Sequence, residues 1–345
     1  MTAPSGLVIV DKPAGMTSHD VVGRIRRLAG TRRVGHAGTL DPLATGVLVV
    51  GVEKATRLLG YLSLTEKEYA ATIRFGQSTS TDDAEGEPTG GTSAAGVSAE
   101  ALHAAVAGLT GEILQVPPGV SAIKVGGRRA YKLARAGAAP ELAPRPVTVY
   151  EFRVTAVRPA GDVLDVDATV RCSSGTYIRA LARDLGAELG TGGHLTALRR
   201  TSAGAYNLAQ ARTLEDLAER LVVTPLEDAA AAAFPRVSLS ADDARRLSHG
   251  ARIPVPATAA ALPGSVAGPP GSVAGPPEAD PAPPLGSIAG SDGADAPPSL
   301  GTVAGPGPVR APEETPLAAF APDGTLVALV TEDSGRLRPL AVFAG

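Results

Sequence analysis

The chain has 345 residues, of which 44% are hydrophobic, and this is enough to form one large domain and a smaller one, each with its own core. Its formal net charge of -3, from 32 basic and 35 acidic residues, excludes a uniformly basic nucleic-acid-binding protein but allows one basic face. The single cysteine, Cys172, excludes a disulfide framework and a cysteine-based metal site within one chain.

The distribution of charge and the start of the chain narrow the class of protein further. Residues 1–60 contain eight Lys and Arg against four Asp and Glu, whereas residues 61–120 contain two against eight. This pattern is equally compatible with a basic face and with ordinary solvated surfaces. Because no apolar run approaches membrane-spanning length and the N-terminus lacks a signal-peptide pattern, we expect a cytoplasmic protein without a membrane anchor.

The first predicted elements are a strand and a helix. Residues 6–10 are a short apolar run followed by Pro13 and Gly15, which predicts a buried strand that leads into a tight loop and leaves Lys12 at the strand end. Ser18 is the predicted N-cap of a helix, because apolar residues follow it at helical spacing.

Residues 35–46, with the sequence GHAGTLDPLATG, form the most distinctive stretch, which we call the signature loop. Its glycines allow conformations that other residues avoid, and Pro42 pushes Asp41 toward extended geometry, so the Asp41 carboxylate is expected at a stiff corner. By spacing alone, an Asp-Pro pair flanked by glycines is more often a plain turn than a catalytic loop. The apolar run at residues 48–50 predicts another strand.

The middle of the chain contains a clear strand and two loops. Residues 69–75 alternate between apolar and other residues, which predicts a half-buried strand that starts at Tyr69 and makes Tyr69 a core residue by pattern alone. Residues 79–86 contain adjacent aspartates but neither a histidine nor a further cluster of carboxylates at ligand spacing, so we expect no metal site there. Residues 117–146 combine Pro and Gly with six basic residues, which indicates either an insertion that grips a phosphate backbone or a flexible surface loop.

The next elements are two strands and a helix. Residues 147–157 and 163–172 are predicted strands, and the alternation of the second makes Cys172 an inert core residue. Residues 178–189 show a helical apolar stripe that leaves Arg179 and Arg183 off the buried face.

The end of the chain divides by composition. Residues 234–256 and 314–345 are predicted to form a small β-rich domain, in which Asp323-Gly324 is a strong hairpin signal. Residues 257–313 repeat Gly, Ser, Val, Ala and Pro with too little apolar surface to offset the entropy of ordering. We therefore expect the small domain to be split by a disordered insertion of low complexity.

Six motifs occur in order along the chain. They are DKPAGMTS at residues 11–18, the signature loop, KEY at 67–69, SAIK at 121–124, SGTYIR at 174–179 and LRR at 198–200. This series resembles TruB-type tRNA pseudouridine synthases of bacteria. The resemblance implies an α+β fold whose catalytic core, residues 1–233, has a mixed, largely antiparallel sheet flanked by helices. It also implies a small β-rich, PUA-like C-terminal domain that binds RNA.

The resemblance also implies roles for individual residues. Asp41 is the aspartate needed for isomerising uridine, Tyr69 stacks on the target uracil, and Arg179 pairs with Asp41. The implied substrate-binding residues are His36, Lys12, Tyr177, Leu198, Lys124 and Arg129.

The implied reaction converts the T-loop uridine of tRNA, uridine-55, into pseudouridine by base flipping and by breaking and rejoining the glycosidic bond. It needs no cofactor or metal, and the expected protein is a monomer that binds the tRNA T stem-loop without a protein partner. Whether Asp41 attacks C1′, attacks the ring or assists elimination stays open.

Two other classes of function compete with this one. A catalytically idle protein that binds or folds tRNA would use the same surface. An enzyme for small molecules with a phosphate-binding glycine loop ranks lower, because the sequence lacks both G-x-x-x-x-G-K-[ST] and G-x-G-x-x-G in the signature loop.

Overall fold

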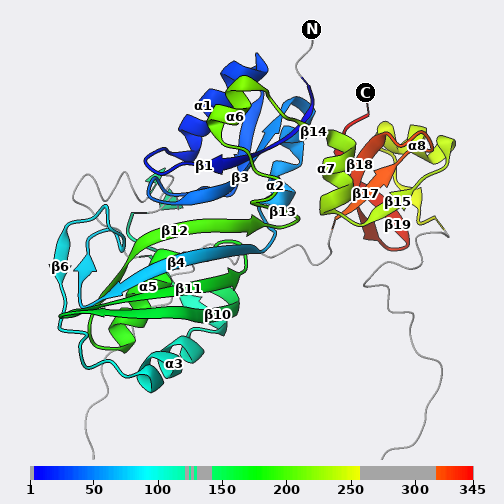
Figure 1. Ribbon diagram of the computed structural model, residues 1–345. Coiled ribbons are helices and arrows are strands. Elements are labelled where there is room, and N and C mark those ends of the chain that lie inside the picture. Colours follow the sequence, from blue (N-terminus) through cyan, green and yellow to red (C-terminus); the bar gives the residue numbers. More distant parts are fainter. Residues whose placement is uncertain (1–3, 121–123, 126–127, 130–141, 257–315, 345) are drawn as a thin grey trace, which may run out of the picture.

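The computed structural model describes residues 4–120, 124–125, 128–129, 142–256 and 316–344. These residues form the predicted α+β fold, with a large sheet flanked by helices and a β-rich unit at the C-terminal end (Figure 1). The strands of the large sheet are β1 (Gly6–Lys12), β2 (Val34–Ala37), β3 (Thr45–Val52), β4 (Lys67–Phe75), β7 (Gly111–Gln115), β10 (Arg145–Ala160), β11 (Val163–Cys172), β12 (Gly193–Ala203), β13 (Tyr206–Asn207) and β14 (Thr224–Pro225).

The order of strands brings distant motifs together at the middle of the sheet. The sheet runs β14-β1-β3-β12-β4-β11-β10-β7, with β2 paired to β3 and β13 paired to β12. Among these pairs only β12 with β3 is parallel. Strand β12 therefore lies between β3, which follows the signature loop, and β4, which carries Tyr69.

Helix α1 (Ser18–Ala29) begins one residue away from the predicted cap. The N-cap is Thr17, whose hydroxyl accepts a hydrogen bond from the Asp20 amide while the Asp20 carboxylate accepts one from the Thr17 amide. This reciprocal capping box satisfies two amides that the helix leaves free. The prediction that Ser18 is the N-cap was wrong, and Ser18 is instead a buried residue of the first turn.

The signature loop begins as a strand, which the sequence did not predict. Residues 34–37 pair with β3, so that His36 lies opposite Val50. The pattern gives little indication of this strand, because Gly35 and His36 interrupt the alternation of apolar residues. After β3 the chain forms the short helices η1 (Glu53–Arg57) and α2 (Leu59–Leu62).

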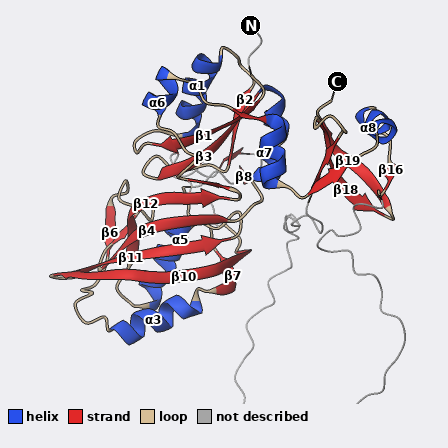
Figure 2. Ribbon diagram, turned by 45° about the vertical axis from the view of Figure 1, so that its right-hand side comes forward, coloured by secondary structure: helices blue, strands red, loops and turns tan. Residues whose placement is uncertain are grey.

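The strands in the centre of the sheet match their prediction closely. Alternate residues of β4, from Tyr69 to Phe75, are buried, and β11 alternates in the same way and ends at Cys172, which is buried. The predicted strands and the core position of Cys172 are thus confirmed. Helix α5 (Ile178–Glu188) covers one side of this part of the sheet, and α3 (Ala99–Gly108) packs against α5 and β10 (Figure 2).

The C-terminal unit is a five-stranded sheet in the order β15-β17-β18-β19-β16. Its strands come from both sides of residues 257–315, and the Asp323-Gly324 hairpin between β17 and β18 is confirmed. The predicted insertion at residues 257–313 lies outside the described residues. The elements of this unit are β15 (Arg236–Ser238), α8 (Ala241–Ser248), β16 (Ile253–Pro254), β17 (Leu317–Phe320), β18 (Leu326–Asp333) and β19 (Arg336–Val342).

The two units share a core. Helix α7 (Leu226–Ala233) lies between them in Figure 1, and one cluster of buried side chains includes Leu7, Ala229, Phe320 and Phe343. The remaining elements are β5 (Ser78–Thr79), β6 (Pro88–Gly90), β8 (Lys124–Val125), β9 (Arg128–Arg129) and α6 (Leu214–Glu219). Within the described ranges no helix is long and apolar enough to cross a bilayer.

Candidate active site

The turn that carries Asp41 is held from several sides. The Ser18 hydroxyl accepts from the Leu40 amide at 2.9 Å and lies 3.1 Å from the Leu40 carbonyl oxygen, to which it donates. The Gly15 amide donates to the Pro42 carbonyl at 2.9 Å, and the Ala44 amide donates to the Asp41 carbonyl at 3.1 Å. The backbone of Asp41 is therefore fixed by its neighbours, while its side chain remains 38% exposed.

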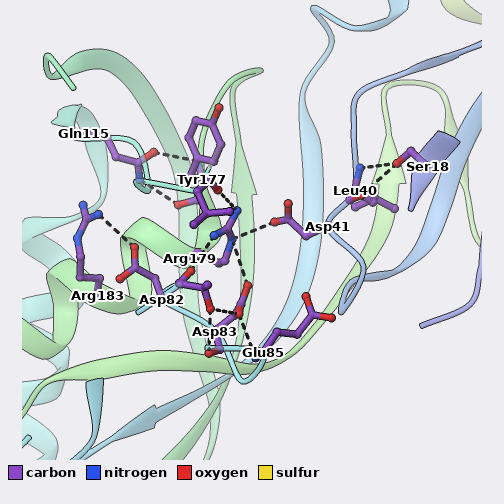
Figure 3. A network of polar contacts seen from close by, with 12 residues as sticks. Ser18, Leu40, Asp41, Asp82, Asp83, Glu85, Gln115, Tyr177, Arg179 and Arg183 are labelled. Atoms are coloured by element: carbon purple, nitrogen blue, oxygen red, sulfur yellow. Dashed lines mark hydrogen bonds and ion pairs between the residues drawn. The ribbon is translucent and has the colours of Figure 1, made fainter. Parts of the chain in front are cut away.

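The first turn of helix α5 places the Arg179 side chain beside Asp41 (Figure 3). Its Nε donates to Asp41 Oδ2 at 3.0 Å, its Nη1 to the Thr81 carbonyl at 2.7 Å and its Nη2 to the Val120 carbonyl at 3.0 Å. The Arg179 side chain is only 5% exposed. The prediction that Arg179 lies off the buried face was wrong, because the loops that contain Thr81 and Val120 cover the first turn of the helix.

The adjacent aspartates Asp82 and Asp83 form ion pairs with two different arginines. Asp83, which is 3% exposed, lies 3.5 Å from Arg179 Nε and accepts from the Glu85 amide at 3.1 Å. Asp82 has a left-handed backbone with φ of 61° and pairs with Arg183 at 3.3 Å. Figure 3 shows the two carboxylates directed toward these separate partners. In the part of the chain that the structure describes, no group of three or more His, Cys, Asp or Glu side chains could hold a metal ion.

Lys12 holds the same turn through hydrogen bonds to backbone carbonyls. Its buried ammonium group donates to the carbonyls of Pro13 at 2.8 Å, Met16 at 2.6 Å and Pro42 at 3.2 Å. Burial lowers the pKa of Lys12 to about 8, against an opposing effect of the Asp41 carboxylate. Lys12 thus joins the loop that contains Pro13 and Met16 to the turn that contains Asp41 and Pro42.

Tyr69, Leu198 and Tyr177 come from three different parts of the chain. Tyr69 on β4 and Leu198 on β12 are each 8% exposed, and burial raises the pKa of the Tyr69 phenol. Tyr177 is the residue before α5, and its backbone amide and carbonyl form hydrogen bonds of 2.8 and 3.1 Å with the side-chain amide of Gln115. Gln115 therefore fixes the backbone of Tyr177, two residues before Arg179.

His36 lies on a strand rather than in a loop. Its ring contacts that of His19 edge to face, with centroids 5.6 Å apart. Burial, followed by His19 and Arg200, lowers the pKa of His36 to about 4, so the ring is neutral near pH 7. Its Nδ1 atom is buried without a hydrogen-bond partner among the described residues.

The basic insertion is described only in part. Lys124 in β8 and Arg129 in β9 are Cα partners in a two-stranded sheet. Residues 121–123 of the SAIK motif, and Lys132 and Arg135, lie outside the described residues.

Three residues of this region were not identified as site residues from the sequence. Asp83 was considered only as a metal ligand, whereas it pairs with Arg179. Arg200 and Lys67 are buried cations, at 1% and 6% exposed, and Arg200 lies opposite Tyr69 in the neighbouring strand. For Arg200 a signal was present, because Leu198 and Arg200 are two residues apart and a strand directs such residues to the same face.

Comparisons with known proteins agree on one family. The sequence profile of the TruB family pseudouridylate synthase N-terminal domain matches residues 26–178, and that of the tRNA pseudouridylate synthase B C-terminal domain matches residues 179–233. A profile named tRNA Pseudouridine synthase II, C terminal, matches residues 307–344.

Relatives named tRNA pseudouridine synthase B match nearly the whole chain. That of Arthrobacter sp. (strain FB24) is 56% identical over 342 residues, covering 99% of this chain and 97% of the relative. That of Thermobifida fusca is 54% identical over 344 residues, covering 99% of both chains.

A solved structure supports the fold. The chain resembles one described as a Cbf5-Nop10-Gar1 complex with a TM-score of 0.63 and 24% identity, covering 100% of this chain and 85% of that one. Together with the relatives at more than half identity, the profiles establish that this chain belongs to the TruB family of pseudouridylate synthases.

Proposed function

We propose that this protein converts a uridine of tRNA into pseudouridine and that its target is uridine-55 of the T loop. The family and the names of the relatives support a tRNA substrate. One observation supports Asp41 as the reactive group. Its carboxylate is partly exposed, it belongs to a turn that is fixed by hydrogen bonds, and the buried Arg179 lies 3.0 Å from it.

The reaction breaks the bond between C1′ and N1 and forms a bond between C1′ and C5. The proton on C5 is lost and N1 gains one, so the composition of the nucleotide does not change. Attack on C1′, attack on the ring and assisted elimination all use an oxygen of the Asp41 carboxylate, and the hydrogen bond from Arg179 Nε holds that carboxylate in one orientation.

The other site residues hold the nucleotide. The target base must leave its stack to reach Asp41, which costs a few kcal/mol that contacts with the flipped nucleotide must offset. Tyr69 stacks on the base and takes part in moving the C5 proton, and Tyr177 and Leu198 line the base. Lys12 braces the Asp41 turn, while His36 occupies the space that the base leaves.

The basic insertion grips the RNA backbone. Lys124 and Arg129 belong to a segment, residues 121–147, with six basic residues and a single acidic one. Contacts of this kind are made to phosphates and release counterions, so they are independent of base sequence.

The decisive variant is Asp41→Asn, which keeps the shape of the side chain and removes its charge. We expect no pseudouridine in tRNA transcripts mixed with this variant, while binding of the RNA stays largely intact. Asp242→Asn on α8, where the aspartate is exposed and pairs with Arg245, is the matched control and should retain full turnover.

The measurement is release of tritium from tRNA labelled at uridine C5, together with mapping of the modified position. Near-normal turnover by Asp41→Asn would contradict the role of Asp41. A wild-type protein that binds tRNA without modifying any uridine would favour the idle RNA-binding alternative. Modification at a position other than uridine-55 would contradict the target but not the reaction.

A further inference from the structure

Arg200 is a buried residue of β12 that bonds to the chain on both sides of Asp41. It is one of the largest fully buried side chains, at 1% exposed. Its Nε donates to the Val47 carbonyl at 2.7 Å, and its Nη2 donates to the Gly38 carbonyl at 3.0 Å. Because Gly38 and Val47 stand on either side of Asp41 in the chain, one guanidinium ties together both ends of the segment that carries the proposed reactive group.

The same guanidinium reaches Tyr69. Arg200 on β12 and Tyr69 on β4 are Cα partners in antiparallel strands, and directly opposed residues project from the same face of a sheet. The Arg200 guanidinium opposes the rise in the pKa of the Tyr69 phenol that burial causes. Arg200 therefore connects the turn of Asp41, whose flanking carbonyls it bonds, with the face of β4 that carries Tyr69.

A role in the fold alone does not account well for this arrangement. In the described part of the chain the hydrogen-bond partners of Arg200 are two backbone carbonyls, and no carboxylate pairs with it. A buried cation without a counter-charge is costly, and Lys67 places a second buried amine beside it. An apolar side chain could fill the same volume without that cost, but it could not bond to the two carbonyls on either side of Asp41.

We propose that Arg200 is a positioning residue for the isomerisation, one that fixes the Asp41 turn and the Tyr69 hydroxyl in a single arrangement around the target base. The proposal rests on the proposed function, because it assumes that Asp41 and Tyr69 act on one nucleotide. Arg200 itself is buried and acts through these two groups.

The test combines kinetics with a cycle of variants. Arg200→Lys keeps the charge but presents a compact ammonium that cannot reproduce the planar fork of the guanidinium between the two carbonyls and Tyr69. We expect its single-turnover rate at saturating enzyme to fall roughly 10- to 100-fold, because misplacing reacting groups costs about that much. Affinity for tRNA should stay within about twofold of wild type, since the lost contacts act on the reaction rather than on RNA binding. Arg158→Lys, on the exposed pair with Asp167, is the matched control and should keep the wild-type rate.

The cycle asks whether Arg200 works through Tyr69. If it does, Arg200→Lys combined with Tyr69→Phe should lose less than the product of the two single losses, because both changes break the same link. Losses that multiply fully, or a folded Arg200→Lys with the wild-type rate, would overturn the proposal.

A spectroscopic readout needs neither substrate nor turnover. With tyrosine labelled at Cζ, the resonance absent in Tyr69→Phe identifies Tyr69, and Arg200→Lys should shift it while Arg158→Lys should not. Tyr69→Phe provides the same test in a protein that keeps Arg200, should the Arg200 variants not fold. The side-chain nitrogen resonances of Arg200 should shift in this variant, and unchanged resonances would overturn the link. A wild-type protein without turnover would refute the proposed function but leave this measurement intact.

Discussion

The Nε atom of Arg179 donates to the Asp41 carboxylate at 3.0 Å, although 138 residues separate the two in the chain. The two partners differ in exposure, since Arg179 is 5% exposed and Asp41 is 38% exposed. The cation is therefore fixed by the protein, whereas the carboxylate can still be approached from solvent. This asymmetry suits a residue pair in which one member reacts and the other orients it.

Arg179→Ala should lose activity mainly in the rate of the chemical step. If Arg179 orients Asp41 in the transition state, kcat and the single-turnover rate fall while tRNA affinity and its salt dependence stay nearly unchanged. The variant should also unfold more easily, by roughly 3 kcal/mol, because the buried Asp83 carboxylate loses its cation. A normal single-turnover rate with weakened binding would show that Arg179 is not a partner of Asp41 in catalysis.

Arg129→Ala should show the opposite behaviour and serves as the comparison. Removing one phosphate contact weakens binding across RNA sequences and reduces the slope of log affinity against log salt by roughly 0.7 to 0.9. Filter binding at several salt concentrations and single-turnover rates, measured on both variants side by side, separate the two roles. An unchanged salt slope in Arg129→Ala would contradict a phosphate contact.

The sequence predicted those parts of the fold and site whose pattern is local. The alternation in β4 and β11 placed Tyr69 and Cys172 correctly, because each strand buries one face along its whole length. The burial of Arg179 could not be predicted in this way. A helical stripe reports the face that packs on the sheet, whereas Arg179 is covered by loops from elsewhere in the chain.

The elements that the pattern missed are short or poor in large apolar residues. Helix α7 is built mostly from alanine, which packs closely between the two units but gives no stripe of large side chains. The motifs suggested which residues matter, while the strand order explains why they meet. Strand β12 brings Arg200 beside Gly46 in β3 and beside Tyr69 in β4.

Gly46→Ala should destabilise the protein strongly. Gly46 has φ of 96°, and a Cβ atom there would lie 2.2 Å from the Arg200 carbonyl oxygen. Strain of this kind costs about 1 to 3 kcal/mol, and the clash with backbone adds to it. Urea unfolding should show a loss of at least about 2 kcal/mol, whereas Gly60→Ala, where nothing lies within 4 Å, should change stability by less than about 1 kcal/mol. Equal effects of the two variants would contradict the close approach of β3 and β12.

Deletion of residues 261–308 should leave turnover and melting temperature nearly unchanged. This stretch contains no Lys or Arg and few large apolar residues, so it offers little for packing or for contact with phosphates. Deletion of residues 124–135, which removes five basic residues, is the comparison and should weaken tRNA binding. A large loss of turnover or stability after the first deletion would show that the segment is a working part of the protein.

Lys67 should make the stability of the protein rise with pH above about 8. Its buried ammonium donates to the carbonyls of Ser63 and Thr65, and burial, with a smaller effect of Arg200, lowers the pKa of Lys67 from 10.5 to about 8. Below pH 8 the amine is charged in both the folded and the unfolded chain, so the cost of burying the charge is fully present. Between about 8 and 10.5 the unfolded chain binds more protons than the folded one, and the free energy of unfolding increases with pH.

Comparison with Lys67→Met isolates this effect, because Met cannot titrate and Lys12, whose pKa is also lowered to about 8, is present in both proteins. Free energies of unfolding are measured in urea at about pH 7 and about pH 9.5. The free energy of unfolding of wild type, relative to that of Lys67→Met, should be larger at the higher pH. The free energy of unfolding of Lys67→Arg should fall relative to that of wild type over the same pH range, because the guanidinium stays charged and its burial remains costly. If the differences between wild type and both variants are independent of pH, Lys67 is not held in the folded protein with a lowered pKa.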